Sequence, residues 1–550
     1  MRRVALLGLL FACGDDGDGP PPTGPITASV THYDYSFDID SRAAHTKLTL
    51  DVTTGGDCIT LPFRAQSLTN VTLGGDVATA TMQGEMINVC GTGQRVGASE
   101  LEADLVIPLA TLSVSQVGYS ITKDSEQNPF YYLVSWIGGC DRFTPCDNRS
   151  DQFATYRFTI THPATFKARC AGTITEVSAT QTECSFDHPG GPTYSTFGVA
   201  AYPAWTIADK GTWGGVKVSV YDRATTGITA KIDTAYHAGY VDWLQSLLGP
   251  YPYGDELRVL TAPTYWSGFE HPGNIVLDDG LAKVTNSIYA NPTQHVLDHE
   301  ITHMWAGDQT TIAGTYDFVW KEAMAEYLSY VYEDMTSATV SLRTAGGWKA
   351  LGQSAKYFPV PMNSPALFDY YGDAYGPGPM VLFRQLEVLT SRQQVLDGIK
   401  SVLGTPHALS VDELIAALEQ STGLDLDAYA NAWIRGTGAP DWPRYAVTFT
   451  PGSGTSMLAL DQINEKPTPR GCKFHVALKG ANADQVQLVE VNTFTGGADQ
   501  TLQVPTPAFT VTSIALDPAA ECLVYLSSSI PRVMRPAWLS ERAGLFAPMN

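Results

Sequence analysis

The stretch His299-Glu300-Ile301-Thr302-His303 places two histidines four residues apart, within a segment (293–305) whose pattern predicts a helix. At this spacing both imidazoles project from one helical face and can reach a single metal ion. Glu300 follows the first histidine, where its carboxylate can take a proton from an attacking water without being a ligand. His295 stands four residues further back, but each such step turns about 40° around the helix, so we expect a packing or solvent-facing role for it.

A third ligand comes from the next predicted helix, 317–334. Glu322 lies near the start of that helix, with eighteen residues between it and His303. Two imidazole nitrogens and one carboxylate oxygen leave one position of a tetrahedral Zn²⁺ open, as in catalytic rather than structural zinc sites. The sequence therefore predicts one Zn²⁺ per chain, bound by His299, His303 and Glu322.

The zinc motif and its surroundings resemble the gluzincin aminopeptidases typified by aminopeptidase N. Upstream of it, the run Ser267-Gly268-Phe269-Glu270-His271 resembles the Gly-Ala-Met-Glu-Asn exopeptidase motif of that family, with His271 in place of Asn. The resemblance implies that Glu270 binds the free α-ammonium of the substrate, with Ser267 and Gly268 as further substrate-binding residues. Only the first residue of a peptide carries that cation, so such a carboxylate would make a peptidase an exopeptidase.

A second run, Tyr375-Gly376-Pro377-Gly378-Pro379-Met380-Val381-Leu382, resembles the Tyr-x-x-Gly-x-x-Val-Leu run of the same family. By this resemblance, the Tyr375 hydroxyl would hydrogen-bond the oxyanion of the tetrahedral intermediate. Tyr370 and Tyr371 are nearby competitors, but neither has a glycine three places later. The chain also departs from the family pattern at Lys321, where Asn is commoner.

The pattern along the chain predicts a multidomain α+β protein. Residues 26–206 alternate apolar and polar side chains between Gly-rich turns, which indicates an N-terminal β-domain. After a strand at 216–221 and an amphipathic helix at 232–247, helical patterns dominate 293–435, with a strong amphipathic segment at 411–419. The resemblance implies a thermolysin-like mixed α/β catalytic domain over 207–440. Alternation returns in 441–550, which predicts a small C-terminal β-sandwich.

Cysteine usage indicates an oxidising compartment. Apart from Cys13, the eight cysteines lie in local pairs, which predicts four disulfides: Cys58 with Cys90, Cys140 with Cys146, Cys170 with Cys184, and Cys472 with Cys522. None of these pairs has the spacing of a cysteine zinc site, so we assign them to structure.

The N-terminal residues predict export. Residues 1–13 combine Arg2-Arg3, a short apolar run and a lipobox-like Leu-Phe-Ala-Cys, so we interpret them as a lipoprotein signal peptide with Cys13 as the lipidation site. The alternative is an ordinary signal peptide that contains a cysteine. Residues 14–25 are a polar, Pro/Gly-rich, flexible tether. We therefore expect a bacterial cell-envelope lipoprotein, periplasmic or at the cell surface, that meets the membrane only through its lipid anchor.

The composition excludes one class of partner. Apolar residues make up 44% and charged residues 16% of the 550 residues, as in a folded protein, and the formal net charge is −22. Such an acidic surface repels nucleic-acid phosphates. The family resemblance implies instead that the partners are peptides with a free N-terminus.

These inferences together predict a zinc-dependent aminopeptidase that hydrolyses the N-terminal peptide bond of peptides. Two alternatives stay open: a zinc endopeptidase, which needs no amine anchor, and a catalytically dead, surface-anchored binding protein of the same fold. An epoxide-hydrolysing side activity, known in relatives, is a further alternative within the family. The sequence does not specify which side chain is preferred at the first residue of the substrate.

Overall fold

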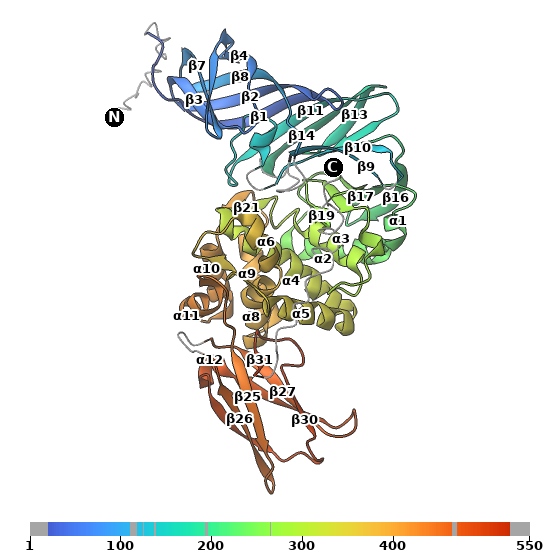
Figure 1. The fold of residues 1–550 in the computed structure, drawn as a ribbon, viewed down its shortest axis with the longest axis vertical. Helices are drawn as coiled ribbons and strands as arrows, with labels where there is room; N and C mark the ends of the chain where they lie inside the picture. Colours follow the sequence, from blue (N-terminus) through green and yellow to red (C-terminus); the bar gives the residue numbers. More distant parts are fainter. Residues whose placement is uncertain are drawn as a thin grey trace, which may run out of the picture.

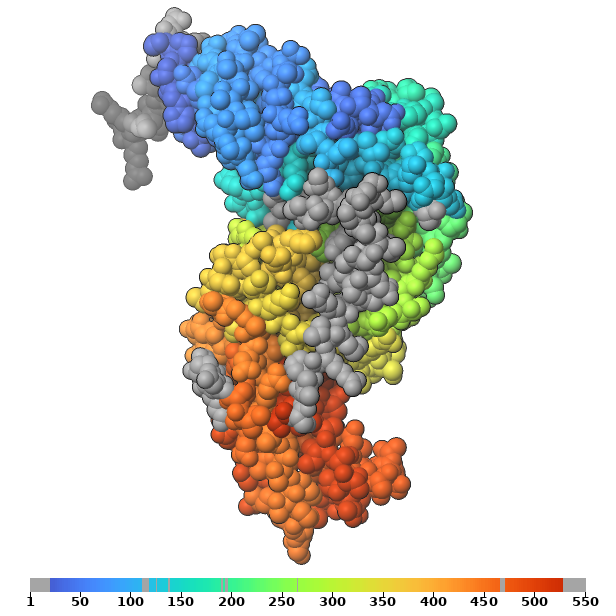
Figure 2. Space-filling view, in the orientation of Figure 1, coloured from blue at the N-terminus to red at the C-terminus, as the bar shows by residue number. Residues whose placement is uncertain are grey.

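The computed structural model describes residues 20–110, 118–124, 126–136, 139–192, 196–264, 266–464 and 470–527. These residues form an elongated, multidomain α+β protein (Figure 1). A strand-rich N-terminal part lies at one end, a helical part in the middle and a second strand-rich part at the other end, and Figure 2 shows the same order on the surface. Cys13, the predicted signal peptide and residues 14–19 of the predicted tether lie outside the described residues.

The N-terminal part is built on an eight-stranded sheet in the order β13-β14-β11-β1-β2-β8-β4-β5. Alternate residues of β1 (Thr27–Asp38) are buried, and Tyr33 stacks on Tyr156 with ring centroids 5.3 Å apart. The other strands of this sheet are β2 (Ala43–Thr54), β4 (Thr69–Leu73), β5 (Asp76–Val77), β8 (Gly97–Val106), β11 (Phe153–Thr161), β13 (Thr173–Ser178) and β14 (Gln181–Pro192).

Two smaller sheets complete the N-terminal part. One has three strands, β3 (Gly56–Pro62), β7 (Met86–Gln94) and β6 (Thr79–Gln83). The other runs in the order β12 (Lys167–Cys170), β15 (Gly198–Tyr202), β10 (Pro129–Val134) and β9 (Gly118–Lys123). Trp136, which follows β10, contacts Phe318 in the helical part with ring centroids 5.4 Å apart. The N-terminal part therefore contributes directly to the middle of the molecule.

The middle part begins with a five-stranded sheet in the order β16-β17-β18-β20-β19. Its strands are β16 (Thr206–Trp213), β17 (Val216–Asp222), β18 (Glu256–Ala262), β20 (Asn274–Asp278) and the short antiparallel edge strand β19 (Gly268–Phe269). β18 and β20 are buried along most of their length, as expected for parallel strands covered on both faces. β19 carries Gly268 at the sheet edge and leads directly into Glu270.

Helices fill the rest of the middle part (Figure 1). The longer ones are α2 (Thr234–Leu248), α3 (Pro292–Thr302), α4 (Phe318–Thr336), α5 (Ala338–Gly352), α6 (Leu367–Ala374), α9 (Arg392–Val402) and α10 (Val411–Thr422). α2 begins two residues later than its apolar pattern predicts, because Asp233 accepts hydrogen bonds from the backbone N–H groups of Ala235 and Tyr236 as an N-cap. α3 ends at Thr302, three residues before the predicted end, but His303 keeps helical dihedrals of −60° and −20°.

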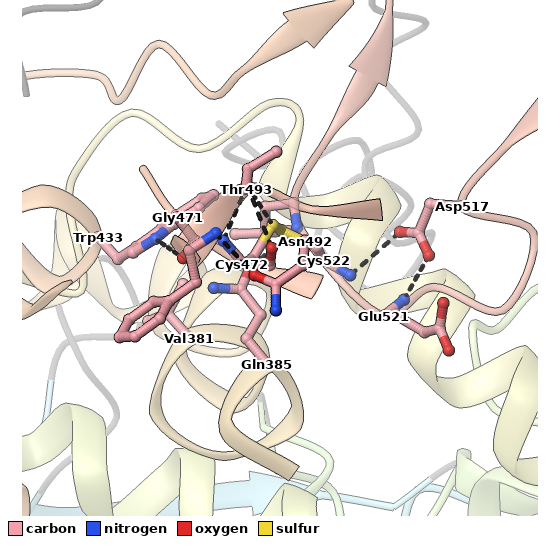
Figure 3. Close-up of a disulfide and its surroundings, with 12 residues drawn as sticks. Val381, Gln385, Trp433, Gly471, Cys472, Asn492, Thr493, Asp517, Glu521 and Cys522 are labelled. Carbon is pink, nitrogen blue, oxygen red and sulfur yellow. Dashed lines mark hydrogen bonds between the residues drawn. A yellow bond between two sulfur atoms is a disulfide. The ribbon is translucent and has the colours of Figure 1, made fainter. Parts of the chain in front are cut away.

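The C-terminal part consists of a four-stranded and a three-stranded sheet. The strands are β25 (Arg444–Thr450), β26 (Thr455–Gln462), β29 (Gln500–Pro505) and β31 (Tyr525–Leu526) in the first, and β27 (Lys473–Lys479), β28 (Val486–Asn492) and β30 (Ser513–Leu516) in the second. Figure 3 shows how the Cys472–Cys522 disulfide lies beside the helical part. There the backbone N–H of Leu523 donates to Gln385 in α8 (Gln385–Leu389), and the Trp433 indole donates to the carbonyl of Gly471.

The four disulfides predicted from cysteine proximity are confirmed: the structure joins Cys58 to Cys90, Cys140 to Cys146, Cys170 to Cys184 and Cys472 to Cys522. Among the described residues, no helix is long and apolar enough to cross a membrane.

Candidate metal centre

α3 and α4 bring three side chains to one buried point. The Nε2 atom of His299 lies 3.1 Å from the Oε2 atom of Glu322 and 3.0 Å from the Nε2 atom of His303. The third side of this triangle, from His303 Nε2 to Glu322 Oε2, measures 3.6 Å. The side chains converge because the two histidines share one face of α3. Glu322 joins them because it lies only four residues after the start of α4.

These separations fit a tetrahedral zinc ion. Zinc–ligand distances of about 2.0–2.1 Å at tetrahedral angles place neighbouring ligand atoms about 3.3 Å apart. The three measured separations, 3.0, 3.1 and 3.6 Å, lie on both sides of that value. All three side chains are buried, so they would shield a bound ion from bulk water.

Polar contacts on the far side of each imidazole orient the two histidines. The Nδ1 atom of His299 lies 3.1 Å from a carboxylate oxygen of Glu326, and the Nδ1 atom of His303 lies 2.9 Å from the carbonyl oxygen of Ala306. An Nδ1–H that donates to these acceptors leaves Nε2 unprotonated, as a metal ligand must be. Glu326 was not singled out from the sequence, although its place one helical turn after Glu322 put it on the same face of α4.

Glu326 is in turn held by a fully buried network. It accepts a hydrogen bond of 2.7 Å from the Trp348 indole, and its two oxygens lie 3.3 Å from the Nε2 atom of His295. The other ring nitrogen of His295 lies 2.8 Å from Glu333. His295 is thus buried and does not reach the three ligands, and it acts through Glu326 on the orientation of His299.

The charges at this point favour a cation. Among the described residues that surround it, the carboxylates of Glu270, Glu300, Glu322 and Glu326 are buried, and the ammonium of Lys321 lies 2.8 Å from Glu270 and from Glu322. Burial lowers the pKa of His299, but its contacts with Glu322 and Glu326 outweigh burial and raise that pKa to about 10. A site that stabilises positive charge on an imidazole to this extent is suited to a divalent cation.

Glu300, in the last turn of α3 beside His299, borders the same space. A Cβ atom at Gly268 would lie 2.3 Å from the Oε1 atom of Glu300, so β19 can approach this carboxylate only because residue 268 is glycine. Burial raises the pKa of Glu300 to about 8, against the lowering effect of His299 and with a further increase from Glu270. A cation bound by the three ligands would lower this pKa again, which suits a general base at neutral pH.

Glu270 also lies beside the point where His299, His303 and Glu322 converge. Carboxylate oxygens of Glu270 and Glu300 and a ring nitrogen of His303 all lie within 4.8 Å of one another. Burial raises the pKa of Glu270, but the charge of Lys321, whose Nζ is 2.8 Å away, outweighs burial and holds that pKa below its usual value. Glu270 is therefore an ionised carboxylate beside the metal centre. Lys321 also lies 2.8 Å from the Oε1 atom of Glu322.

The structure distinguishes the three tyrosines considered from the sequence. The Tyr375 hydroxyl donates a 2.7 Å hydrogen bond to the ligand oxygen of Glu322, and its ring stacks near that of His299. The Tyr371 hydroxyl lies 2.5 Å from that of Tyr375. The Tyr370 hydroxyl instead donates to the carbonyl of Pro359. Tyr375 is thus the tyrosine placed at the ligands.

The remaining residues of the predicted motif have separate places. Ser267 and Gly268 line a cavity that also borders Glu300. His271, which replaces the Asn of the family motif, is fully buried, and a Cβ atom at Gly198 of β15 would lie 2.2 Å from its ring. His271 therefore packs against the N-terminal part.

Comparisons with known proteins place this site in context. No protein-family model matches the sequence. The chain is 25% identical over 222 residues to aminopeptidase N of Streptomyces lividans, a match that covers 36% of this chain and 25% of the relative. The chain thus spans about a quarter of the length of the curated relative that it matches. This match extends over part of the chain the resemblance to aminopeptidase N that the zinc motif carries.

Solved structures share the fold of this chain. The M1 zinc metallopeptidase of Deinococcus radiodurans superposes with a TM-score of 0.60 at 19% identity, over 75% of this chain and 95% of that protein. Aminopeptidase A of Legionella pneumophila, solved with aspartic acid, superposes with a TM-score of 0.68 at 13% identity, over 94% of this chain and 60% of that protein. These likenesses show that the multidomain α+β fold predicted from the sequence is correct.

Proposed function

We propose that this chain is a gluzincin, a zinc-dependent aminopeptidase that binds one Zn²⁺ per chain and removes the first residue of peptides. The observation that carries the proposal is the position of Glu270, an ionised, buried carboxylate within 4.8 Å of Glu300 and of the ligand His303. A carboxylate there pairs with the α-ammonium of a peptide and places the first peptide carbonyl at the metal centre. A peptidase that cleaves interior bonds has no use for this anion.

The residues around the centre divide the reaction among them. When bound by His299, His303 and Glu322, a zinc ion polarises a carbonyl and lowers the pKa of water toward about 7. Glu300 takes a proton from the water while the water oxygen bonds to the carbonyl carbon. It then gives that proton to the leaving nitrogen as the C–N bond breaks. The Tyr375 hydroxyl can turn from Glu322 to donate to the carbonyl oxygen as negative charge develops on it.

A related structure supports peptides as the substrate class. A mutant of the M1 zinc metallopeptidase of Deinococcus radiodurans has been solved with a Tyr-Ser-Ala substrate, and it is 20% identical to this chain over 75% of this chain's length. That protein shares the fold of this chain. In this chain, His299, His303 and Glu322 would bind the metal, and Glu300 and Glu270 lie close enough to act on a substrate there.

The test of this proposal compares free and blocked substrates. We expect the purified protein to hydrolyse alanine p-nitroanilide, to lose at least about 100-fold of that activity on chelation, and to regain it with added Zn²⁺. N-acetyl-alanine p-nitroanilide, which lacks the ammonium, is the matched control and should be hydrolysed at least about 100-fold more slowly. Equal rates on both substrates would contradict the proposal, and so would a rate unaffected by chelation.

We also propose that the protein is exported and is anchored through a lipid on Cys13. Four disulfides in the described residues support an oxidising compartment, because cytosolic thiols are kept reduced. The lipobox-like sequence before Cys13 supports the anchor. In the source cell, we expect the protein in the membrane fraction and its Cys13→Ala variant in the soluble fraction. A wild-type protein that is wholly soluble would contradict the anchor.

A further inference from the structure

One lysine side chain is enclosed beside the candidate metal centre. Lys321, in α4 directly before the predicted ligand Glu322, is fully buried, which is rare for a lysine. Its Nζ atom lies 2.8 Å from the Oε1 atom of Glu270 and 2.8 Å from the Oε1 atom of Glu322. A single ammonium group therefore joins the predicted amine anchor to a predicted metal ligand.

The same ammonium group lies close to the ligand nitrogen of His303. The distance from the Nζ atom of Lys321 to the Nε2 atom of His303 is 3.4 Å. The Oε2 atom of Glu322, which lies 3.6 Å from that nitrogen, belongs to the carboxylate whose other oxygen contacts Lys321. Two of the three predicted metal ligands therefore lie against a positive charge that belongs to the protein itself.

The surroundings of Lys321 fit its long side chain. A Cβ atom at Gly307 would lie 2.7 Å from the Cε atom of Lys321 and 3.1 Å from its Cγ atom, so the glycine leaves room for the stem of the lysine. Gly307 also has a φ of 140°, which side chains other than glycine rarely adopt. The ring of Phe318, at the start of α4, has its centroid 5.9 Å from the Nζ atom, within the range of a cation–π contact. These contacts hold the ammonium group at the two carboxylates.

Lys321 changes the charge that a metal ion meets at this site. Glu270 and Glu322 each offer one carboxylate oxygen to the ammonium group, which offsets part of their attraction for a divalent cation. The ammonium group also repels such a cation directly. A charge at about 4–6 Å shifts a proton equilibrium by about 1–3 pKa units, which is about 10- to 1,000-fold in binding. A divalent cation carries twice the charge of a proton, so we expect an effect of at least that size.

We propose that the charge of Lys321 weakens the binding of zinc to His299, His303 and Glu322, and so sets the zinc affinity of this chain. The inference rests on the proposed function, because it takes these three side chains as the zinc ligands. Asn, which is commoner at this place in the family that the sequence resembles, carries no charge. The lysine therefore makes the zinc of this chain easier to remove than a neutral residue at position 321 would.

The experiment measures the zinc dissociation constant of the full chain by competition with a chelator of known affinity. Lys321→Met keeps an unbranched side chain and removes the charge, and its dissociation constant should be at least about tenfold lower than that of the wild type. Lys321→Gln keeps an N–H donor for the two carboxylates without the charge and should also bind zinc at least about tenfold more tightly. A merely structural role for Lys321 predicts the opposite, because ligands that have lost their support bind zinc more weakly.

Lys349→Met is the matched control. Lys349, in α5, is also mostly buried and pairs with Asp517 in the C-terminal part. Its partner is not one of the carboxylates at the metal centre, so the zinc dissociation constant should stay within about twofold of the wild-type value. Should Lys321→Met fail to fold, Lys321→Gln decides. An unchanged or higher dissociation constant in the folded variant would overturn the inference and leave the aminopeptidase proposal standing. A wild-type protein that binds no zinc would overturn both.

Discussion

Glu300→Ala is expected to keep the zinc ion and to lose turnover by at least about 10³-fold, because the carboxylate is not a ligand but moves the proton. His299 and His303 keep their acceptors at Glu326 and Ala306 in this variant, so their orientation is preserved. Metal content per chain and kcat on alanine p-nitroanilide, measured on the same sample, check the prediction.

Glu300→Gln is the isosteric control for packing. Glu300 contacts Gly268 closely, so alanine leaves a void there and glutamine does not. Both variants should be equally inactive if the lost function is proton transfer. Near-wild-type turnover in either variant would contradict the role given to Glu300. Loss of zinc in both would instead show that Glu300 helps to hold the ion.

Glu270→Gln is expected to lower kcat/KM on alanine p-nitroanilide by about 150-fold, which corresponds to about 3 kcal/mol for a buried charge pair that loses one partner. Its side chain keeps its shape but no longer offers a full negative charge to the α-ammonium. Lys321 keeps its 2.8 Å contact with Glu322, so the ligand set remains paired. Steady-state kinetics with the free and the N-acetylated substrate check the prediction.

The same variant distinguishes the exopeptidase from the endopeptidase alternative. Only an exopeptidase should lose activity on free N-termini and keep its low rate on blocked substrates. Glu490→Gln, on an exposed position of β28, is the matched control and should change kcat/KM by less than about twofold. A Glu270→Gln variant that cleaves alanine p-nitroanilide as well as wild type would refute the amine anchor.

The sequence predicts the three ligands because their geometry is local. Two histidines four apart share a helical face whatever the rest of the fold does, and Glu322 needs only that the next helix folds back on the first. Glu326 lies on the same face of α4 as Glu322. The sequence contains 56 acidic residues, however, and nothing in it distinguishes Glu326 from the others until its distance to His299 is known.

The contact between Trp136 and Phe318 could not be predicted in this way. Trp136 and Phe318 are 182 residues apart in the sequence, and only the contact between the N-terminal part and α4 brings them together. Hydrophobic patterns indicate that such residues are buried, but not which buried residues from distant segments meet. The fold class followed from patterns within each segment, whereas the aromatic packing beside the site depends on contacts between segments.

The position of bound zinc tests the central claim most directly. Crystals of the purified protein, measured at the zinc absorption edge, should show one anomalous peak per chain at the point where the Nε2 atoms of His299 and His303 and the Oε2 atom of Glu322 converge. An empty site in protein prepared with zinc would contradict the account, and so would a peak bound by any other set of side chains.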